Sequence, residues 1–263
     1  MIAFFLLAFA IAWSMWALAG RFTDGAALSA TGQIILLIGV FGPGISAMLL
    51  SAMKGGSAEA KALFGQIGRF RVPARYYAFA VAFLAAVKLT AAVLIRLSTG
   101  AWPAFGTEPI AIIIGTLFVS TWTQAGEELG WRAYALPPLA TRMGLGPASI
   151  VIGVIWAVWH LPLFYAPYSN TYGQSFPLYL LQVVAISIAM GWLYWRTQGS
   201  LLLVMLFHAA INNTANIVPS RLEGATDAMS LHASTVGWTT VALLWAAAAY
   251  FLYSMRGVRS VGA

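Results

Sequence analysis

The chain contains no cysteine among its 263 residues, and only 8% of its residues are charged. The missing thiols exclude disulfide bonds, cysteine zinc sites and cysteine-based catalysis. A charged fraction this low is far below the roughly 25% that is typical of soluble domains. Hydrophobic residues make up 61% of the chain instead. This composition predicts an integral membrane protein, because each helical span through a bilayer needs about 20 mostly apolar residues.

The apolar residues fall into eight segments, each close to the length of one membrane span. The sequence shows no internal repeat and no soluble domain. We therefore expect an all-α bundle of about eight transmembrane helices that forms a single domain over residues 1–263. The first segment is expected to be a retained helix, because it is longer than the core of a signal peptide. The predicted spans are approximately 2–20, 29–52, 76–98, 109–136, 147–165, 176–195, 200–218 and 235–255.

Basic residues are distributed unequally between the two sides of this predicted bundle. The 53–75 connection carries five Lys and Arg, and alternation of the spans places nine of the 14 basic residues on its side. The opposite side receives Arg21, Arg96 and Arg221, and its 166–175 connection has no charge. The positive-inside rule then puts 53–75 and both termini in the cytoplasm. The pI of about 9.9 therefore reflects topology, and we expect membrane lipid, not nucleic acid, as a partner.

Two of the seven acidic residues lie inside an apolar segment. Glu127 and Glu128 are adjacent in the predicted 109–136 span, where an ionised carboxylate costs roughly 2.5–3.5 kcal/mol. Arg132 follows Glu128 by four residues, which is the spacing of an ion pair on a helix. Glu127 points about 100° away around the helix and stays free for another role. Taken alone, Glu128 and Arg132 are interpreted as a structural pair, and the intramembrane Lys88 is assigned no role.

Two glycines flank the acidic pair in the same predicted span. Gly126 and Gly130 have the small-xxx-small spacing that lets a second helix approach closely. We therefore expect a close helix contact at this point of the 109–136 segment.

Two of the three histidines also lie in apolar segments. His160 falls near the end of 147–165, and His208 lies in the middle of 200–218 with Asn212 one turn later on the same face. Taken singly, each of these side chains is explained by a hydrogen bond to a neighbouring helix. Together with the carboxylates and Arg132, they place six polar groups on three spans of a chain that otherwise avoids buried charge. Such a set indicates a functional site.

The order and spacing of these residues resemble a known family, the type II CAAX prenyl endopeptidases and bacteriocin-processing proteases of membranes. The resemblance covers about residues 109–218 and rests on three motifs. They are Glu-Glu-xxx-Arg at 127–132, Phe-xxx-His at 156–160 with Trp156 in place of Phe, and His-xxx-Asn at 208–212.

This resemblance implies an intramembrane endopeptidase that hydrolyses a peptide bond of a membrane-associated or lipidated protein or peptide. It implies that Glu127 activates a water and that His160 helps to position it. His208 and Asn212 are then expected to donate hydrogen bonds to the tetrahedral oxyanion. By the same resemblance, Glu128 and Arg132 shape the site. The site is expected to open toward the cytoplasm, and the Cys-free, Ala-rich composition favours a bacterial inner membrane.

Three alternatives stay open at this point. Glu127, His160 and His208 include donors that zinc accepts, although the chain lacks the His-Glu-x-x-His spacing of metalloproteases. We therefore favour a metal-free mechanism without a cofactor. A non-catalytic immunity or scaffold relative would share the fold, and a proton-coupled transporter also uses buried carboxylates and histidines.

Counted from the predicted span ends, His160 lies about 20 Å deep and Glu127 about 12–14 Å, so His160 fits the site least well.

Overall fold

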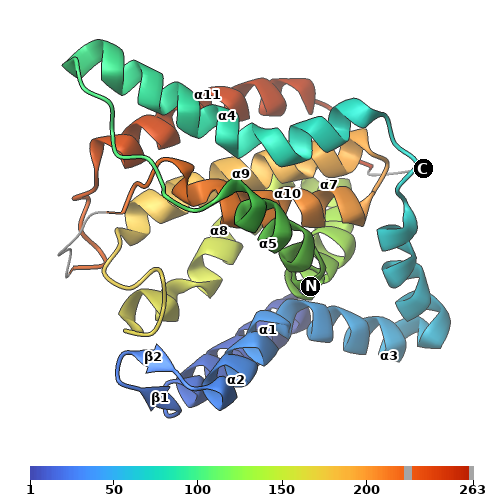
Figure 1. Ribbon diagram of the computed structural model, residues 1–263. Coiled ribbons are helices and arrows are strands. Elements are labelled where there is room, and N and C mark those ends of the chain that lie inside the picture. The colour runs from blue at the N-terminus through green and yellow to red at the C-terminus, as the bar shows by residue number, and fades with distance from the viewer. Residues whose placement is uncertain (222–226, 261–263) are drawn as a thin grey trace.

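A computed structural model describes residues 1–221 and 227–260 of the chain. Within these residues the fold is helical, apart from one antiparallel hairpin of two-residue strands, β1 (Thr23–Asp24) and β2 (Ala27–Leu28). The helices pack into one bundle (Figure 1). In chain order they are α1 (Ile2–Ala19), α2 (Ala30–Val40), α3 (Gly42–Gly65), η1 (Gln66–Gly68), α4 (Ala74–Thr99), α5 (Ile110–Thr123), α6 (Ala125–Glu128), η2 (Leu129–Ala135), α7 (Leu136–Met143), α8 (Leu145–Trp159), η3 (Leu161–Tyr165), α9 (Phe176–Arg196), α10 (Leu201–Thr214), η4 (Ala215–Ile217) and α11 (Thr235–Ser254).

The helices have the lengths and the surface of a membrane protein. In the described part of the chain, five helical segments are long and apolar enough to span a bilayer, and the bent pair α2 and α3 makes a sixth if it forms one span. Large apolar side chains face outward, as do Ile114 at 61% and Phe118 at 69% exposure on α5. An aqueous surface rarely carries such a continuous apolar area. The all-α membrane bundle is thus confirmed, while the count of eight spans and the cytoplasmic termini stay predictions.

The apolar segment 109–136 is not one continuous helix. It divides into α5, the single turn α6 and the π-helical segment η2, with a break at Gln124. All residues from Gly126 to Ala133 are buried in the protein. Irregular backbone is tolerated at membrane depth where protein surrounds it, and π-helical turns often occur at functional sites. The irregular part of the segment, α6 and η2, therefore contains the Glu-Glu-xxx-Arg motif.

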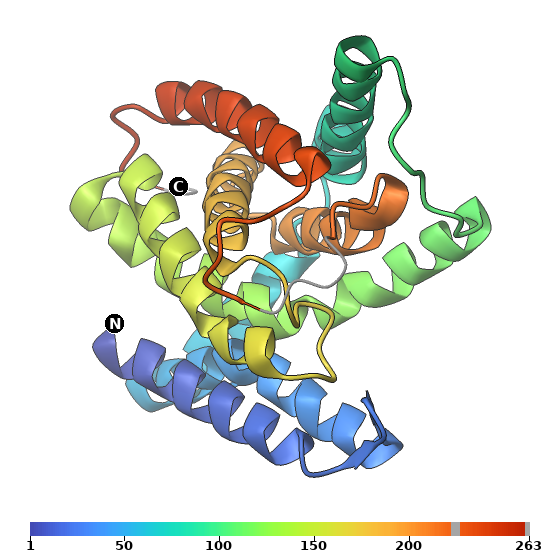
Figure 2. The same ribbon diagram turned by 90° about the vertical axis from the view of Figure 1, so that its left-hand side faces the viewer.

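The central element of the bundle is α9. Buried positions make up 67% of its span, against 28% for α1 and 33% for α11. Figure 2 shows why, because α11 and α4 lie on one side of the bundle, α1 and α2 lie on the other, and α8, α9 and α10 run between them. The core that supports the functional site is therefore built around α9.

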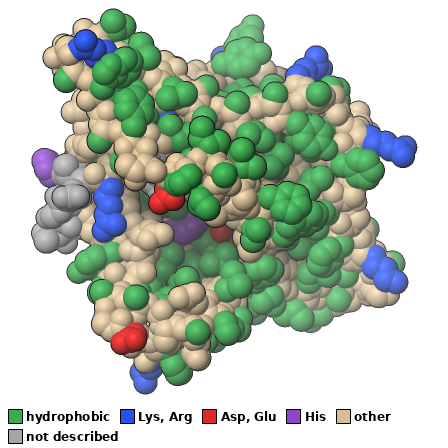
Figure 3. Space-filling view, in the orientation of Figure 1, with side chains coloured by type: hydrophobic (Ala, Val, Ile, Leu, Met, Phe, Trp, Pro, Cys, Tyr) green, Lys and Arg blue, Asp and Glu red, His purple; other side chains and the backbone are tan. Residues whose placement is uncertain are grey.

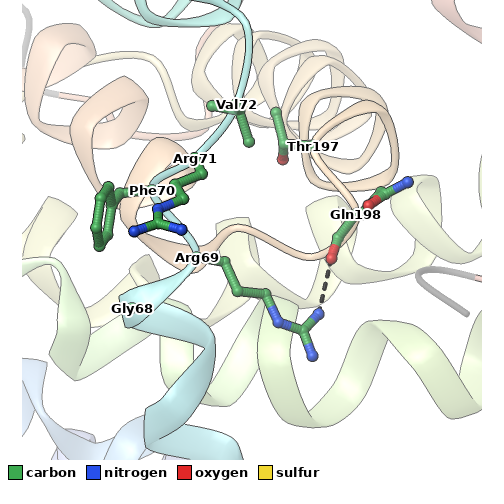
Figure 4. A pocket seen from close by; sticks show the side chains of 7 residues that line it. All are labelled: Gly68, Arg69, Phe70, Arg71, Val72, Thr197 and Gln198. Carbon is green, nitrogen blue, oxygen red and sulfur yellow. Dashed lines mark hydrogen bonds between the residues drawn. The ribbon is translucent and has the colours of Figure 1, made fainter.

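One end of the bundle carries most of the basic residues. There, Arg69 Nη1 donates a 2.7 Å hydrogen bond to the carbonyl oxygen of Gln198, which ties the turn after η1 to the turn between α9 and α10 (Figure 4). The backbone N–H of Leu145 donates to the carbonyl of Val258 at 2.8 Å, which brings the C-terminal segment to the same end. We call this the basic end. Its helix ends and connections hold Lys54, Lys61, Arg69, Arg71, Arg75, Arg142, Arg196, Arg256 and Arg259.

The other end of the bundle gathers the connections that carry few charges. Ser175 Oγ donates to the carbonyl of Ser230 at 2.6 Å, and Arg221 Nη2 donates to the carbonyl of Tyr172 at 3.4 Å. These bonds join the 166–175 connection to the segments between α10 and α11. We call this the cavity end, since these connections line a cavity.

Candidate active site

The three motifs converge on one cavity of about 590 Å³. Glu127 reaches it from α6, His160 from the position just after α8, and His208 and Asn212 from α10. A space-filling view shows a hollow in the largely apolar face of the molecule, with a histidine side chain visible inside it (Figure 3). The four residues predicted to be catalytic therefore lie in one place, and their individual roles stay predictions.

Glu128 is the centre of a buried charge network. Its Oε1 atom accepts hydrogen bonds from Arg132 Nη1 at 3.0 Å and from His208 Nδ1 at 2.8 Å. Arg132 Nη2 also donates to Ser187 Oγ on α9 at 3.3 Å. Glu128 is 0% and Arg132 1% exposed, so removing either partner would leave an uncompensated charge in a medium that cannot solvate it. The network holds the His208 ring in a fixed orientation.

The hydrogen bonds of the two histidines determine which ring nitrogen is left for chemistry. His208 donates from Nδ1 to the Glu128 carboxylate. His160 Nδ1 lies 2.9 Å from the carbonyl oxygen of Trp156, which can only accept, so this nitrogen carries the proton. In both rings Nε2 is therefore the nitrogen that can hydrogen-bond to a molecule in the cavity. In a neutral His160 this Nε2 has a free lone pair.

Trp156 connects all three motifs. Its indole Nε1–H donates to Glu127 Oε2 at 2.6 Å. The Arg132 guanidinium carbon lies 4.6 Å from the centre of its ring, and the His208 ring centre lies 5.1 Å away. In sequence terms Trp156 only replaces one aromatic residue by another. The structure shows a hydrogen bond that no Phe can form, so Glu127, expected to be free, has one oxygen already engaged.

The depth mismatch expected for His160 does not occur. Its ring centre lies 5.9 Å from that of Trp156, which in turn contacts His208 and Glu127. The mismatch disappears because α10 is only 14 residues long, so His208 lies in the half of this helix that is nearer the cavity end. His160, which follows the last residue of α8, lies at the same end.

Sequence reasoning missed several residues that line the cavity. Lys88 on α4 was assigned no role, yet it lines the same cavity as Glu127. Tyr179 and Gln182 on α9 also line it, and no motif spacing pointed to them. Lys88 could have been found, because a charged residue inside a span is a functional candidate by default.

The rim of the cavity belongs to the cavity end of the bundle. Asn170, Thr171 and Gln174 line it on one side, and Ser220 and Arg221 on another. The sequence predicted both that the 166–175 connection lies outside and that the site opens toward the cytoplasm. Because this connection lines the cavity, these two predictions cannot both hold.

The zinc alternative finds no matching cluster of side chains. Within residues 1–221 and 227–260, no group of three or more His, Asp or Glu side chains is arranged to hold a metal ion. The hydrogen bonds of His208 and His160 do not argue against a metal, because metal-ligating histidines also donate their other ring N–H to a carboxylate or a backbone carbonyl. The metal-free mechanism stays a prediction.

Comparison with known proteins finds a match to the segment that carries these residues. Residues 108–214 match the family described as type II CAAX prenyl endopeptidase Rce1-like. The segment that carries the site is Rce1-like. The chain is also similar to the CAAX prenyl protease 2 of Methanococcus maripaludis, with 32% identity over 114 residues. That match covers 41% of this chain and 41% of the relative, so the chain is aligned to less than half of that protein's length. The resemblance that the motifs predicted is confirmed for this Rce1-like segment.

Proposed function

We propose that the protein is an intramembrane endopeptidase that hydrolyses a peptide bond of a membrane-associated or lipidated protein or peptide. The observation that carries this proposal is the position of Glu127 on a polar cavity inside an apolar bundle, beside His160, His208 and Asn212. Hydrolysis requires a base near the attacking water and donors directed at the developing negative charge. The Rce1-like segment supplies both kinds of group. We also propose a bacterial inner membrane as its location.

Glu127 is the general base of the proposed reaction. It takes a proton from the water as the water oxygen bonds to the peptide carbonyl carbon, whose C=O electron pair moves onto oxygen. The tetrahedral intermediate then collapses, the C–N bond breaks, and the proton passes from Glu127 to the leaving amine. His160 Nε2 accepts the second O–H of the water and so orients its lone pair toward the carbonyl. Trp156 holds one Glu127 oxygen, which leaves the other for the water.

His208 and Asn212 stabilise the oxyanion. The amide of Asn212 donates directly. His208 donates from Nε2 when both its nitrogens are protonated, because Nδ1–H is already given to Glu128. Donors fixed in advance in a water-poor site are typically worth about 10²–10³ in rate.

A Glu127→Gln variant tests the base assignment. Gln keeps the size of the side chain and a carbonyl oxygen for Trp156, but it cannot accept the proton from the water. We expect hydrolysis of a prenylated CAAX-type peptide by the reconstituted protein to fall by at least about 10²-fold. Glu59→Gln is the matched control, since Glu59 lies at the surface and pairs with Lys54.

The same experiment separates this function from its competitors. Cleavage that persists in Glu127→Gln at the wild-type rate would exclude the glutamate mechanism. A proton-coupled transporter would instead lose proton flux into vesicles in the variant, with no peptide product from either protein.

A further inference from the structure

A pocket of about 550 Å³ lies at the basic end of the bundle, between the segment after η1 and the turn after α9 (Figure 4). We call it the arginine pocket. Its lining contains two arginines and no acidic side chain, and consists of Gly68, Arg69, Phe70, Arg71, Val72, Thr197 and Gln198. In the part of the chain that the structure describes, no carboxylate lies within 4.0 Å of either guanidinium group. The pocket therefore carries positive charge that no acidic side chain there neutralises.

Arg69 is held in the arginine pocket by the turn that follows α9. Its Nη1 atom donates to the carbonyl oxygen of Gln198 at 2.7 Å. Gln198 has a φ of +52°, although Gly or Asn is the usual residue in this conformation after a helix. A Cβ atom at Gly199 would lie 2.7 Å from Arg69 Nη1, so the glycine leaves room for the guanidinium group. One hydrogen bond uses one of the five N–H donors of an arginine, so Arg69 is oriented and can still bind an anion.

The opposite wall of the arginine pocket is the segment 68–72, which is tied to two helices. The Tyr77 hydroxyl on α4 donates to the carbonyl oxygen of Phe70 at 2.7 Å, and the Tyr194 hydroxyl on α9 donates to Gln66 Oε1. Arg71 extends from this segment beside the Phe70 ring, with its guanidinium carbon 5.9 Å from the ring centre. Both walls are thus fixed by the fold, and Arg71 stays exposed.

The arginine pocket also lies where two candidate membrane spans end. The span of α9 ends at Arg196 and the span of α4 begins at Ala74, so the pocket residues directly adjoin both. The polar head groups of a bilayer lie at this depth, just outside the hydrocarbon core. Phe70 and Phe64 are 55% and 49% exposed, and they provide apolar surface beside the two arginines.

We propose that the arginine pocket binds the phosphate group of an anionic phospholipid. The planar guanidinium fork matches the geometry of phosphate oxygens, and basic pockets at the ends of transmembrane helices bind lipid head groups. The excess positive charge favours a head group with net negative charge over a zwitterionic one, and the volume suits one small ligand. This site is separate from the cavity that contains Glu127, and it does not depend on the proposed endopeptidase function.

The test titrates purified protein in a non-ionic detergent with two fluorescent lipids that have the same acyl chains. One is phosphatidylglycerol, which is anionic, and the other is phosphatidylcholine, which is zwitterionic. We expect the wild type to bind phosphatidylglycerol at least about tenfold more tightly, since each arginine near an anionic lipid contributes about fivefold. The Arg71→Gln and Arg69→Gln variants are each expected to weaken phosphatidylglycerol binding by about fivefold.

Arg142→Gln is the matched control for the loss of one charge. Arg142 is exposed at the same end of the bundle, in the last turn of α7, and it does not line the arginine pocket. Its substitution is expected to change the dissociation constant by less than about twofold. A loss in Arg142→Gln equal to that in Arg71→Gln would show diffuse attraction to the whole basic end, and would reject the pocket.

Two further outcomes would reject the proposal without any substitution. One is equal affinity of the wild type for the two lipids. The other is displacement of phosphatidylglycerol by inorganic phosphate at equal concentration, which would identify a site for the free ion in place of a lipid. Retained lipid binding in the presence of phosphate supports the lipid assignment.

Discussion

At the scale of single residues, the least expected role belongs to Trp156. The family pattern has Phe at this position, and the sequence alone gave no reason to see more than an aromatic side chain there. In the fold its N–H lies 2.6 Å from Glu127, and its ring face covers Arg132. One side chain thus orients the proposed base and shields the charge network behind it from the cavity.

Replacing Trp156 with the family residue, as Trp156→Phe, tests this role. The variant keeps the aromatic ring but leaves Glu127 without its donor, and a hydrogen bond to a charged group contributes about 1.5–3 kcal/mol. We expect kcat to fall by about tenfold or more, with little change in KM, in steady-state peptide cleavage.

The control for that substitution is Trp159→Phe. Trp159 is equally buried, but its Nε1 donates to the backbone carbonyl of Ala8 at 3.3 Å and not to a site residue. An equal fall of kcat in both variants would mean that Trp156 acts through packing alone.

Sequence reasoning located the site residues well and their partners poorly. The Glu128–Arg132 pair follows from helical spacing, and the structure contains it at 3.0 Å. Contacts between helices, such as His208 with Glu128 or Trp156 with Glu127, depend on how α6, α8 and α10 rotate against one another. No periodicity within one segment encodes these rotations.

At the scale of elements, the contact that positions Glu127 and Glu128 is the approach of α3 to η2. A Cβ atom at Gly130 would lie 2.5 Å from Pro43 Cβ and 2.7 Å from the Pro43 backbone. The expected close approach at Gly126 and Gly130 is therefore present, and the partner is the start of α3.

The division of 109–136 into α5, α6 and η2 was not predicted, because its apolar pattern is that of a continuous span.

Gly130→Ala is predicted to destabilise the protein by about 1–3 kcal/mol, since backbone atoms of Pro43 cannot move aside cheaply. Thermal unfolding in detergent measures the effect. Gly115→Ala on α5 is the matched control, with no atom within 4 Å of the added Cβ and an expected stabilisation of up to about 1 kcal/mol from the higher helix propensity of Ala. Equal melting temperatures for the two variants would show that the α3–η2 contact is loose.

At the scale of the whole molecule, the cavity and the basic residues occupy opposite ends. The positive-inside rule places the basic end in the cytoplasm, and the 166–175 connection lines the cavity at the other end. The rule therefore predicts that substrate reaches the site from the non-cytoplasmic side. The conflict is invisible in the sequence, because the spacing of the apolar segments does not show which connections border the site.

Single cysteines can decide the orientation, because the native chain has none. Asn170→Cys lies at the cavity end and Lys61→Cys at the basic end, and both positions are exposed. In intact bacterial cells we expect a membrane-impermeant maleimide to label Asn170→Cys at once and Lys61→Cys only after permeabilisation. The reverse pattern would show that the cavity opens to the cytoplasm.

The π-helical segment η2 also limits how this site can be transferred or altered. A π-helical turn accommodates one residue more than the regular helix around it, so its register differs from that of an ordinary α-helix. Deleting a single residue between Leu129 and Ala135 would rotate everything beyond it by about 100° relative to the acidic pair. The motif therefore depends on the π-helical backbone around it as well as on its residues. Grafted onto a regular helix, the same six residues would still pair Glu128 with Arg132, but the residues beyond the π-helical turn would lie on different faces relative to the acidic pair.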